Sequence, residues 1–285
     1  MARDALRSRA ELLAGAAELL GAAGVPEPRR EAFRLWRDLT DQHPAEALLR
    51  PGEPVAEALA AQLLEAAARR GRGEPLAHVT GRAGFRRLTL RSDRRALIPR
   101  PETEGLIDLL LARVRSGRAA DVGTGTGALA LSLAQEGGFE LVVGVDLSAE
   151  ALILAAENRR ATGLGVSLVR GDLCQPLAPG SLDALVSNPP YLTDGEYAML
   201  DPAVRDWEPA EALASGADGM SATHRLLDTG RRVLRPGGWL AIEVDCARAG
   251  ACARRAGELG WDDIAIHADL FGRERYLLAR RSAIP

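Results

Sequence analysis

From about residue 105 onward the sequence alternates short apolar runs with helix-like segments, and this pattern leaves few folds open. Strands that alternate with helices predict βαβ units, in which helices cover both faces of a mainly parallel sheet. Seven strands are expected, at Arg118–Val122, Leu141–Asp146, Val166–Arg170, Leu182–Ser187, Trp239–Val244, Ile264–Ala268 and Arg275–Ala279. Helices are expected between the first five strands, at Ala128–Gln135, Ala149–Thr162 and Thr223–Leu234, the last stopped by Arg235-Pro236-Gly237-Gly238.

The first part of the chain has the pattern of helices separated by Pro and Gly breaks. The expected helices are Asp4–Ala23, Glu31–Leu39, Pro44–Leu49 and Val55–Arg70. These predict three regions: an N-terminal helical bundle over residues 1–73, a linker over 74–104 with a β-hairpin that includes Phe85–Leu90, and the α/β domain over 105–285.

Composition and charge narrow the class of protein. The 285 residues are 47% hydrophobic and 26% charged, as in a globular protein, with a formal net charge of −3. An acidic chain has no overall attraction for phosphate, which weighs against a protein that binds duplex nucleic acid. The three cysteines, Cys174, Cys246 and Cys252, show neither metal-ligand spacing nor a disulfide framework, so no metal site is predicted and a reducing cytoplasm is expected.

A glycine-rich loop is expected where the first predicted strand turns into its helix, at Asp121-Val122-Gly123-Thr124-Gly125-Thr126-Gly127. Glycines let the backbone turn sharply and approach a ligand closely, so this loop predicts a nucleotide-like cofactor. The alternative is an ordinary tight turn, and dinucleotide enzymes use a related pattern. Asp146, at the end of the second strand, can accept hydrogen bonds from ribose hydroxyls or cap the helix that begins near Ser148.

Two more candidate groups follow the third and fourth strands. A carboxylate at Asp172 can accept from an adenine amino group while Leu173 packs on the ring, although Asp is also a common turn residue. Asn188-Pro189-Pro190-Tyr191 follows the apolar run that ends at Ser187. Prolines lack N–H donors, so carbonyls near them stay available to a substrate NH2 group, while Asn188 adds an acceptor and Tyr191 a flat face. This segment predicts a clamp for a planar nitrogen, with a simple Pro-Pro turn as the alternative.

All four groups follow the carboxyl ends of strands, where open α/β sheets bind ligands. Their order along the chain resembles that of the S-adenosylmethionine-dependent methyltransferases. This resemblance implies a Rossmann-like methyltransferase fold and S-adenosyl-L-methionine as cofactor. A dehydrogenase would account for the glycine loop and Asp146 but would leave the Asn-Pro-Pro-Tyr segment without a role.

Further segments resemble one family of amino-methylating enzymes, the release-factor glutamine methyltransferases (HemK-like). The similar segments are Glu74-Pro75-Leu76-Ala77-His78-Val79-Thr80-Gly81, Phe85, Leu97-Ile98-Pro99-Arg100-Pro101-Glu102-Thr103-Glu104, Trp207-Glu208-Pro209-Ala210-Glu211-Ala212-Leu213 with Gly216 and Gly219, and Asp269-Leu270-Phe271-Gly272-Arg273-Glu274-Arg275. The resemblance covers about residues 74 to 281. Members of this family methylate the side-chain amide of the glutamine in the Gly-Gly-Gln loop of peptide-chain release factors.

The resemblance implies a role for each candidate residue. The implied cofactor-binding residues are Gly123, Thr124, Gly125, Thr126, Gly127, Asp146, Asp172, Leu173 and Asn188; the implied glutamine-binding and catalytic residues are Asn188, Pro189, Pro190 and Tyr191. The N-terminal helices would recognise the release factor. Arg100, Glu102 and Thr103 would either close over the cofactor or simply begin a helix.

Two positions depart from the family pattern. Glu243-Val244-Asp245-Cys246-Ala247 stands where the family commonly has Glu-Ile-Gly, and Leu173 stands where it often has an aromatic residue. The first departure predicts a loop of different shape after the fifth strand. The second predicts weaker packing against adenine.

Amide chemistry determines the expected mechanism. An amide nitrogen is a poor nucleophile, because its lone pair is delocalised into the carbonyl, so positioning must do most of the work. We expect the Asn188 side-chain oxygen and the Pro189 carbonyl to accept the two amide hydrogens and to aim the nitrogen at the methyl group. Tyr191 would hold the plane of the glutamine side chain, and no metal is required.

Two alternatives remain open from the sequence. An adenine-N6 methyltransferase would stack a flipped base on Tyr191 and would need a basic groove. A non-catalytic binding protein would keep the fold as a scaffold. The expected partner is a release factor, with no stable nucleic-acid binding, no membrane association and a monomeric state; no stretch approaches the roughly 20 apolar residues that span a bilayer.

Overall fold

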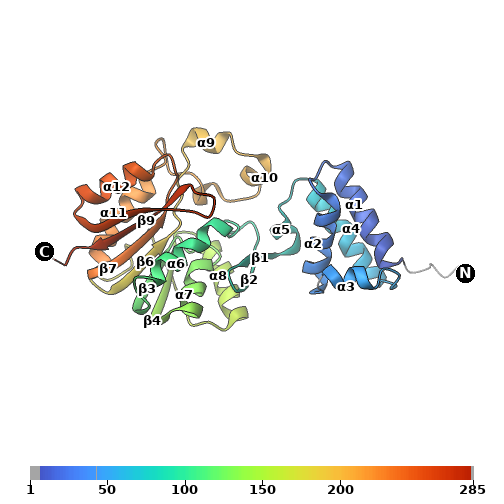
Figure 1. Cartoon of the computed structure of the whole chain (residues 1–285), viewed down its shortest axis with the longest axis horizontal. Coiled ribbons are helices and arrows are strands. Elements are labelled where there is room, and N and C mark those ends of the chain that lie inside the picture. The colour runs from blue at the N-terminus through green and yellow to red at the C-terminus, as the bar shows by residue number, and fades with distance from the viewer. Residues whose placement is uncertain (1–6, 43, 284–285) are drawn as a thin grey trace, which may run out of the picture. The chain divides into compact units, whose positions relative to one another are not determined.

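A computed structural model describes residues 7–42 and 44–283 of the chain (Figure 1). The chain forms two compact units. The first comprises residues 1–82 together with Pro202–Trp207, and the second comprises Ala83–Asp201 and Glu208–Pro285.

The N-terminal unit is helical, as predicted. Its helices are α1 (Arg9–Ala22), α2 (Pro28–Thr40), α3 (Pro44–Leu49), α4 (Glu57–Gly71) and α5 (Leu76–Thr80), with α10 (Pro202–Arg205) from the later segment. Leu12, Leu35 and Leu63 from α1, α2 and α4 are buried in one shared core. Ser8 caps α1, because its hydroxyl accepts from Glu11 N at 3.3 Å while the Glu11 carboxylate accepts from Ser8 N at 2.8 Å. The predicted helical residues from Asp4 to Leu6 lie outside the described part of the chain.

The predicted hairpin is present. Strands β1 (Arg82–Phe85) and β2 (Leu88–Arg91) form a separate two-stranded sheet. The segment Phe85–Leu90 contains the turn of this hairpin, because Arg86 adopts a positive φ of 51° and the chain reverses there. The short helix α5 was not expected, because five residues are too few for a periodic signal.

The second unit contains the predicted seven-stranded sheet. Its strands are β3 (Ser116–Val122), β4 (Gly138–Asp146), β5 (Ser167–Arg170), β6 (Leu182–Ser187), β7 (Leu234–Glu243), β8 (Trp261–Ala268) and β9 (Glu274–Arg281). They lie in the order β5-β4-β3-β6-β7-β9-β8. Only β9 is antiparallel to its neighbours, so the sheet is mainly parallel, which confirms the predicted fold class.

Alternate residues of each strand enter different cores on the two faces of the sheet. Leu185 of β6 joins a core that contains residues of α11 (Ser221–Val233) and α12 (Ala249–Glu258). The next residue, Val186, joins a core that contains residues of α6 (Gly105–Leu111) and α7 (Ala128–Glu136). Every residue of β6 is buried, as expected for a central strand covered on both faces (Figure 1).

The topological switch point lies between β3 and β6. From β3 the chain continues outward through β4 and β5, then returns to β6 on the other side of β3. Neighbouring parallel strands end at the same edge, so the loops after β3 and β6 are brought together. Ser187 strengthens this junction, because its hydroxyl donates to the Val122 carbonyl at 2.6 Å.

The region after α11 differs from the prediction. The helix ends at Val233, but the strand begins at once, with Leu234 paired to Leu182. Arg235 to Gly238 then form an irregularity within β7, and regular pairing resumes where Trp239 pairs with Ala184. The Pro-Gly-Gly sequence therefore bends the strand as well as stopping the helix. Helix α12 was also not expected, because the residues it buries, Ala249, Cys252 and Ala256, are small and stand among glycines and arginines.

The helix α8 (Ala149–Thr162) has the bounds that were predicted. Short helices complete the unit: η1 (Pro101–Glu104), α9 (Asp194–Ala198) and η2 (Ala210–Ala212). Within the described residues, no helix is both long and apolar enough to cross a membrane.

Gly105, at the start of α6, gives a test of the packing beside η1. A Cβ atom at Gly105 would lie 2.6 Å from the Tyr276 hydroxyl oxygen, whereas one at Gly230 in α11 would make an ordinary contact of 3.7 Å with Trp261. Alanine normally stabilises a helix relative to glycine, so Gly230→Ala is expected to raise the free energy of unfolding by roughly 0.5–1 kcal/mol. Gly105→Ala is expected to lower it by about 1–3 kcal/mol through overpacking. Urea unfolding of both variants measures the difference, and equal effects would contradict this packing.

Candidate functional site

A cavity of about 610 Å³ opens at the carboxyl edge of β3 to β6, within the range typical of ligand sites. Nine of the predicted site residues line it: Gly123, Thr124, Gly125, Thr126, Asp146, Asp172, Leu173, Asn188 and Pro190. Gly127, Pro189 and Tyr191 lie outside the lining. Four segments far apart in sequence therefore meet around one cavity.

The glycine loop exposes its backbone to this cavity. Gly123, Gly125 and Gly127 all have positive φ, at 74°, 54° and 84°, which other residue types rarely adopt. Gly127 also allows close packing, because a Cβ there would lie 3.4 Å from the side chain of Ala155 in α8. The loop is held by Gly123 N and Thr124 N, which donate to the Val145 carbonyl at 2.8 and 2.9 Å.

A buried carboxyl group holds the glycine loop through hydrogen bonds. Asp121 is fully buried, and its Oδ2 accepts from Thr124 Oγ1 at 2.6 Å and from Ala130 N at 3.1 Å. Its Oδ1 has no hydrogen-bond partner among the described residues. Burial raises the pKa of Asp121 to about 7. Asp121 thus belongs to the structure of the loop and does not line the cavity.

Asp146 reaches the cavity from the end of β4. Its Oδ2 accepts from Gly125 N at 2.8 Å and its Oδ1 accepts from Ser148 N at 2.9 Å. Each carboxylate oxygen has a second lone pair, so Asp146 can order the glycine loop and still accept two ligand hydroxyls. The helix is capped by Ser148, whose hydroxyl accepts from Ala151 N at 3.2 Å, so Asp146 is not needed for that purpose.

Asp172 and Leu173 follow β5. Asp172 Oδ2 forms an ion pair with Arg225 of α11, which also lines the cavity, and its backbone carbonyl closes a turn with Gln175 N at 3.1 Å. Leu173 has a φ of 49°, an uncommon conformation for a branched side chain. In this conformation the residue lines the cavity, and its side chain packs against the core.

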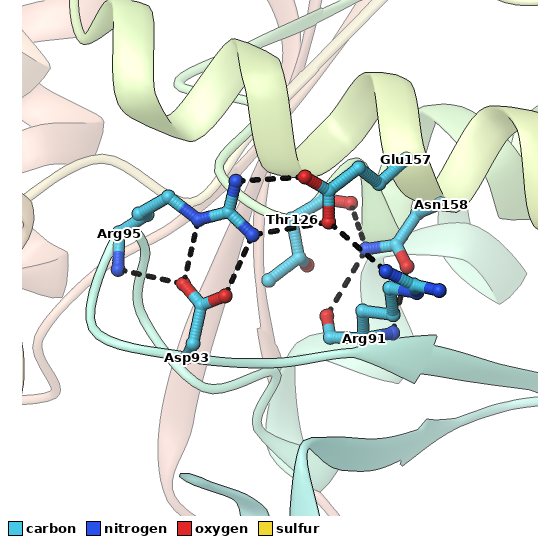
Figure 2. Close-up of polar contacts among 6 residues, drawn as sticks. All are labelled: Arg91, Asp93, Arg95, Thr126, Glu157 and Asn158. Atoms are coloured by element: carbon cyan, nitrogen blue, oxygen red, sulfur yellow. Dashed lines mark hydrogen bonds and ion pairs between the residues drawn. The ribbon is translucent and has the colours of Figure 1, made fainter.

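A polar network around α8 holds the segment that follows β2 (Figure 2). The Asn158 side-chain amide donates to the carbonyls of Thr126 at 2.9 Å and Arg91 at 3.1 Å, and its oxygen accepts from Arg91 N at 2.6 Å. Arg95, which lines the cavity, bridges Asp93 and Glu157 through pairs of hydrogen bonds. One buried asparagine therefore ties the glycine loop and the hairpin to the same helix.

Asn188 belongs to a second network, on the opposite side of the glycine loop. Its Nδ2 donates to Thr103 Oγ1 at 3.0 Å, and Thr103 Oγ1 donates to Glu243 Oε2 at 2.7 Å. Glu243 ends β7 and is only 1% exposed. Burial is the main cause that raises its pKa. Among the described residues no donor reaches Asn188 Oδ1 or the Pro189 carbonyl, so both acceptors are available to a ligand.

Tyr191 faces the same carboxylate. Its hydroxyl donates to Glu243 Oε1 at 3.4 Å, and burial raises the pKa of Tyr191 to about 12. The tyrosine therefore stays neutral over the physiological range.

The segment Leu97–Arg100 is held over the cavity by Glu208. This carboxylate, 5% exposed, accepts from Ile98 N at 3.0 Å and pairs with Arg100 Nη2 at 2.5 Å. Arg100 and Thr103 both line the cavity, and they also flank and form η1. The interpretation of this segment as the start of a helix is therefore confirmed, and its closure over a cofactor stays a prediction.

Sequence reasoning missed three parts of the site. Glu243 was noted only as a departure, Glu208 only as part of a resemblance, and Arg225 was not noted. A charged residue at the end of an apolar strand, as at Glu243, was the available signal. Its partners come from distant segments, so the sequence could not show what it bonds.

The loop after β7, expected to differ in shape, is held by ionic contacts. Asp245 Oδ1 accepts from Ala247 N at 2.9 Å and pairs with Arg248 at 3.0 Å. Arg248 also pairs with Glu196 of α9 at 2.6 Å. The loop is thereby fastened to the segment that follows the Asn-Pro-Pro-Tyr sequence.

The fold and the site together define a methyltransferase of the Rossmann-like class. Residues 101–204 match the methyltransferase small domain family, and residues 11–81 match the PrmC N-terminal domain family. Two solved structures share the fold at low identity. The hMettl16 catalytic domain in complex with the MAT2A 3′UTR hairpin 6 has a TM-score of 0.59 at 16% identity, covering 78% of this chain and 83% of that one. A methyltransferase from Pyrococcus furiosus has a TM-score of 0.51 at 19% identity, covering 68% and 88%.

Sequence relatives identify the family. The release factor glutamine methyltransferase of Deinococcus radiodurans is 41% identical over 95% of this chain and 98% of its own length. Those of Nitratidesulfovibrio vulgaris and Streptomyces coelicolor are 36% and 37% identical, over 96% and 95% of this chain and 95% and 97% of their own lengths. The chain belongs to the release factor glutamine methyltransferase family.

The buried Asp121 predicts a pH effect on stability. Its folded pKa of about 7 lies above its ordinary value of 3.8, so folding takes up a proton between these values. Its contribution to stability is fully present below about pH 4 and is lost as pH rises through about 7, by at most about 4 kcal/mol. Asp121→Asn removes this titration. The free energy of unfolding of the wild type minus that of the variant should therefore fall between about pH 4 and about pH 7, and a constant difference would refute the assignment.

Proposed function

We propose that this protein transfers the methyl group of S-adenosyl-L-methionine to the side-chain amide nitrogen of the glutamine in the Gly-Gly-Gln loop of peptide-chain release factors. The observation that carries the proposal is the orientation of Asn188. Its Nδ2 is bound to Thr103, which leaves its Oδ1 as an acceptor in the lining of the cavity. The carbonyl of Pro189, the next residue along the chain, is a second acceptor, and two acceptors fit a group with two N–H donors, such as a primary amide.

The residues around the cavity fit the proposed cofactor. The bare backbone of Gly123 and Gly125 allows close approach of an amino-acid portion, and Asp146 offers acceptors to ribose hydroxyls. Leu173 offers an apolar surface and Asp172 a carboxylate for an adenine ring. When bound, the cofactor supplies an electrophilic methyl group on a positively charged sulfur.

The protein's own contribution is to position and polarise the amide. Asn188 Oδ1 and the Pro189 carbonyl accept the two amide hydrogens, which fixes the direction in which the nitrogen lone pair can react. Well-oriented reactants can reach effective molarities of about 10⁵ M or more, so positioning alone can supply several kcal/mol. As the N–C bond forms and the bond between the methyl group and sulfur breaks, positive charge would pass from the sulfur to the nitrogen, where the same two oxygens would stabilise it. The nitrogen then releases one proton to water.

Tyr191 completes the substrate side of the site in this proposal. With its hydroxyl directed to Glu243, the ring has a fixed orientation beside the prolines. We propose that the ring holds the glutamine plane.

We further propose that the N-terminal helices, about residues 1–73, recognise the release factor. In support, the matched PrmC N-terminal domain family extends over residues 11–81. The three cysteines are all free, as suits a reducing compartment, so we place the protein in the cytoplasm. A monomer without stable nucleic-acid binding is proposed, in keeping with the net charge of −3.

Labelled cofactor distinguishes the possible substrates. The protein is incubated with methyl-labelled S-adenosylmethionine and, separately, release factor, a release-factor variant without the loop glutamine, and DNA. Label on the intact factor alone is the expected result. Label on DNA alone would establish an adenine methyltransferase instead, and cofactor binding without transfer to any substrate would establish a binding protein.

Asn188→Ala is expected to abolish turnover while cofactor binding persists. The variant removes the acceptor for one amide hydrogen, so kcat should fall by at least about 100-fold, the scale seen when one stabilising group is removed from a transition state. The cofactor Kd, from equilibrium dialysis, should stay within about threefold of the wild type. A near wild-type rate would show that Asn188 does not clamp the substrate.

Leu173→Ala is expected to give the opposite pattern. Removing the apolar side chain from the cavity lining should raise the cofactor Kd by about 5- to 30-fold, the effect of about 1–2 kcal/mol of lost apolar contact. The kcat at saturating cofactor should change much less, because no group near the amide is altered. An unchanged Kd would remove Leu173 from the cofactor site.

A further inference from the structure

We infer that Glu243, acting through Thr103, determines which way the Asn188 amide faces and so presents its oxygen to the substrate. The inference rests on the proposed function, because it assigns a positioning role for the same reaction. Glu243 and Thr103 are positioning residues: neither is required to touch the reacting atoms.

The geometry forms a chain of two hydrogen bonds. Glu243 Oε2 accepts from Thr103 Oγ1 at 2.7 Å, and Thr103 Oγ1 accepts from Asn188 Nδ2 at 3.0 Å. The three residues come from the end of β7, from η1 and from the loop after β6. Thr103 is 140 positions from Glu243 and 85 positions from Asn188, so only the tertiary fold brings the three residues together.

The chain has a direction because a hydroxyl group has only one proton. An ionised carboxylate can only accept hydrogen bonds. The Thr103 hydroxyl must therefore use its one hydrogen atom to donate a hydrogen bond to Glu243. Thr103 then has only lone pairs to offer to Asn188, and these require an N–H group. The nitrogen of the Asn188 amide must therefore face Thr103, which places its oxygen on the opposite side.

The direction depends on the charge of Glu243. If Glu243 becomes protonated, its O–H can donate to Thr103, whose own proton then points to Asn188. The Asn188 amide would turn its oxygen inward to accept that proton, and its NH2 group would face the substrate. Two NH2 groups facing each other cannot form a hydrogen bond, so the substrate amide would lose one acceptor.

The charged and titratable groups that face Glu243 come from every neighbouring element. Arg275 of β9 lies 3.7 Å from Oε1 and favours the ionised form, and the Tyr191 hydroxyl donates to the same oxygen. Glu102 of η1 and burial oppose ionisation, and the Tyr276 hydroxyl, on β9, donates to the Glu102 carbonyl. Asp269 forms an ion pair with Arg275 at 2.9 Å, and it competes with Glu243 for the positive charge of Arg275. The pKa of Glu243 is raised above its ordinary value of 4.5.

The chain contains only two asparagines, Asn158 and Asn188, which makes the amide orientation directly observable. Both are described by the structure, and their surroundings differ. Asn158 is held through both ends of its amide by backbone groups of Arg91 and Thr126, which do not titrate. It serves as an internal reference for Asn188.

The first experiment uses protein labelled with ¹⁵N in the asparagine side chains, without substrate. Two NH2 pairs are expected, and only the Asn188 pair should shift as pH falls through the pKa of Glu243. In Glu243→Gln the Asn188 pair should, at every pH, lie away from the position that it has in the wild type with ionised Glu243. It should no longer titrate. The Asn158 pair should stay in place in both proteins. An Asn188 pair that neither titrates nor moves in the variant would overturn the inference, whatever the activity.

The second experiment uses variants of similar shape with wild-type release factor. Thr103→Val removes the hydroxyl, and Glu243→Gln can donate to Thr103, so both should lower kcat by roughly 10- to 100-fold, the value of one hydrogen bond to a charged group. Thr103→Ser restores the hydroxyl and should recover most of that loss. Thr162→Val is the matched control, because that hydroxyl bonds only carbonyls within α8. The cofactor Kd should be unchanged in all four variants.

The pH profile separates positioning from a structural role. The wild-type kcat should decline on the acid side as Glu243 becomes protonated, whereas kcat of Glu243→Gln should already be low and should lack that decline. If kcat of Thr103→Val and Glu243→Gln equals that of the wild type, the positioning role is refuted while the proposed function stands. If the wild type does not methylate release factor, the proposed function fails, and the labelled asparagine spectra still decide the orientation of Asn188.

Discussion

The parallel pairing of β3 with β6 is the constraint on which the site depends. It brings the glycine loop after Val122 beside Asn188, and the Ser187 hydroxyl bonds across the two strand ends at 2.6 Å. Because β4 and β5 extend from one side of β3 and β6 and β7 lie on the other, the proposed cofactor-binding groups Asp146 and Asp172 lie on one side of this junction and the proposed substrate-binding groups on the other. Methyl transfer needs the two reactants in contact, and the switch point is where this fold can place them so.

Buried carboxylates set the orientation of the neutral groups around this junction. Asp121 accepts hydrogen bonds from the glycine loop, Glu208 holds the segment before η1, and Glu243 accepts a hydrogen bond from the Thr103 hydroxyl. Burying a carboxylate is costly unless donors surround it, so each one fixes the donors that it bonds. If the hydrogen bonds of a network can be satisfied in only one way, its side chains have a single arrangement. Groups that are already arranged in this way stabilise a transition state without reorganising.

The strand pattern was readable from the sequence because the central strands are buried on both faces. Continuous apolar runs such as Leu182–Ser187 and the helix Ala149–Thr162 were predicted with their observed bounds. The failures share a physical cause. The irregularity at Arg235 to Gly238 and the helix α12 depend on backbone conformation or on the packing of small side chains against the sheet, which a search for large apolar residues does not show.

The sequence by itself determined the α/β architecture, the glycine loop and the acceptor-rich segment at Asn188, because apolar alternation, glycine and proline act locally on the backbone. Only the tertiary structure decided that Asp121 is buried beneath the loop, that Tyr191 turns its hydroxyl to Glu243, and that Thr103 separates Glu243 from Asn188. Hydrogen bonds between residues 52 to 140 positions apart form only after the sheet has assembled. The residue types can therefore be read in advance, but the direction of each bond follows from which charged group the fold buries beside it.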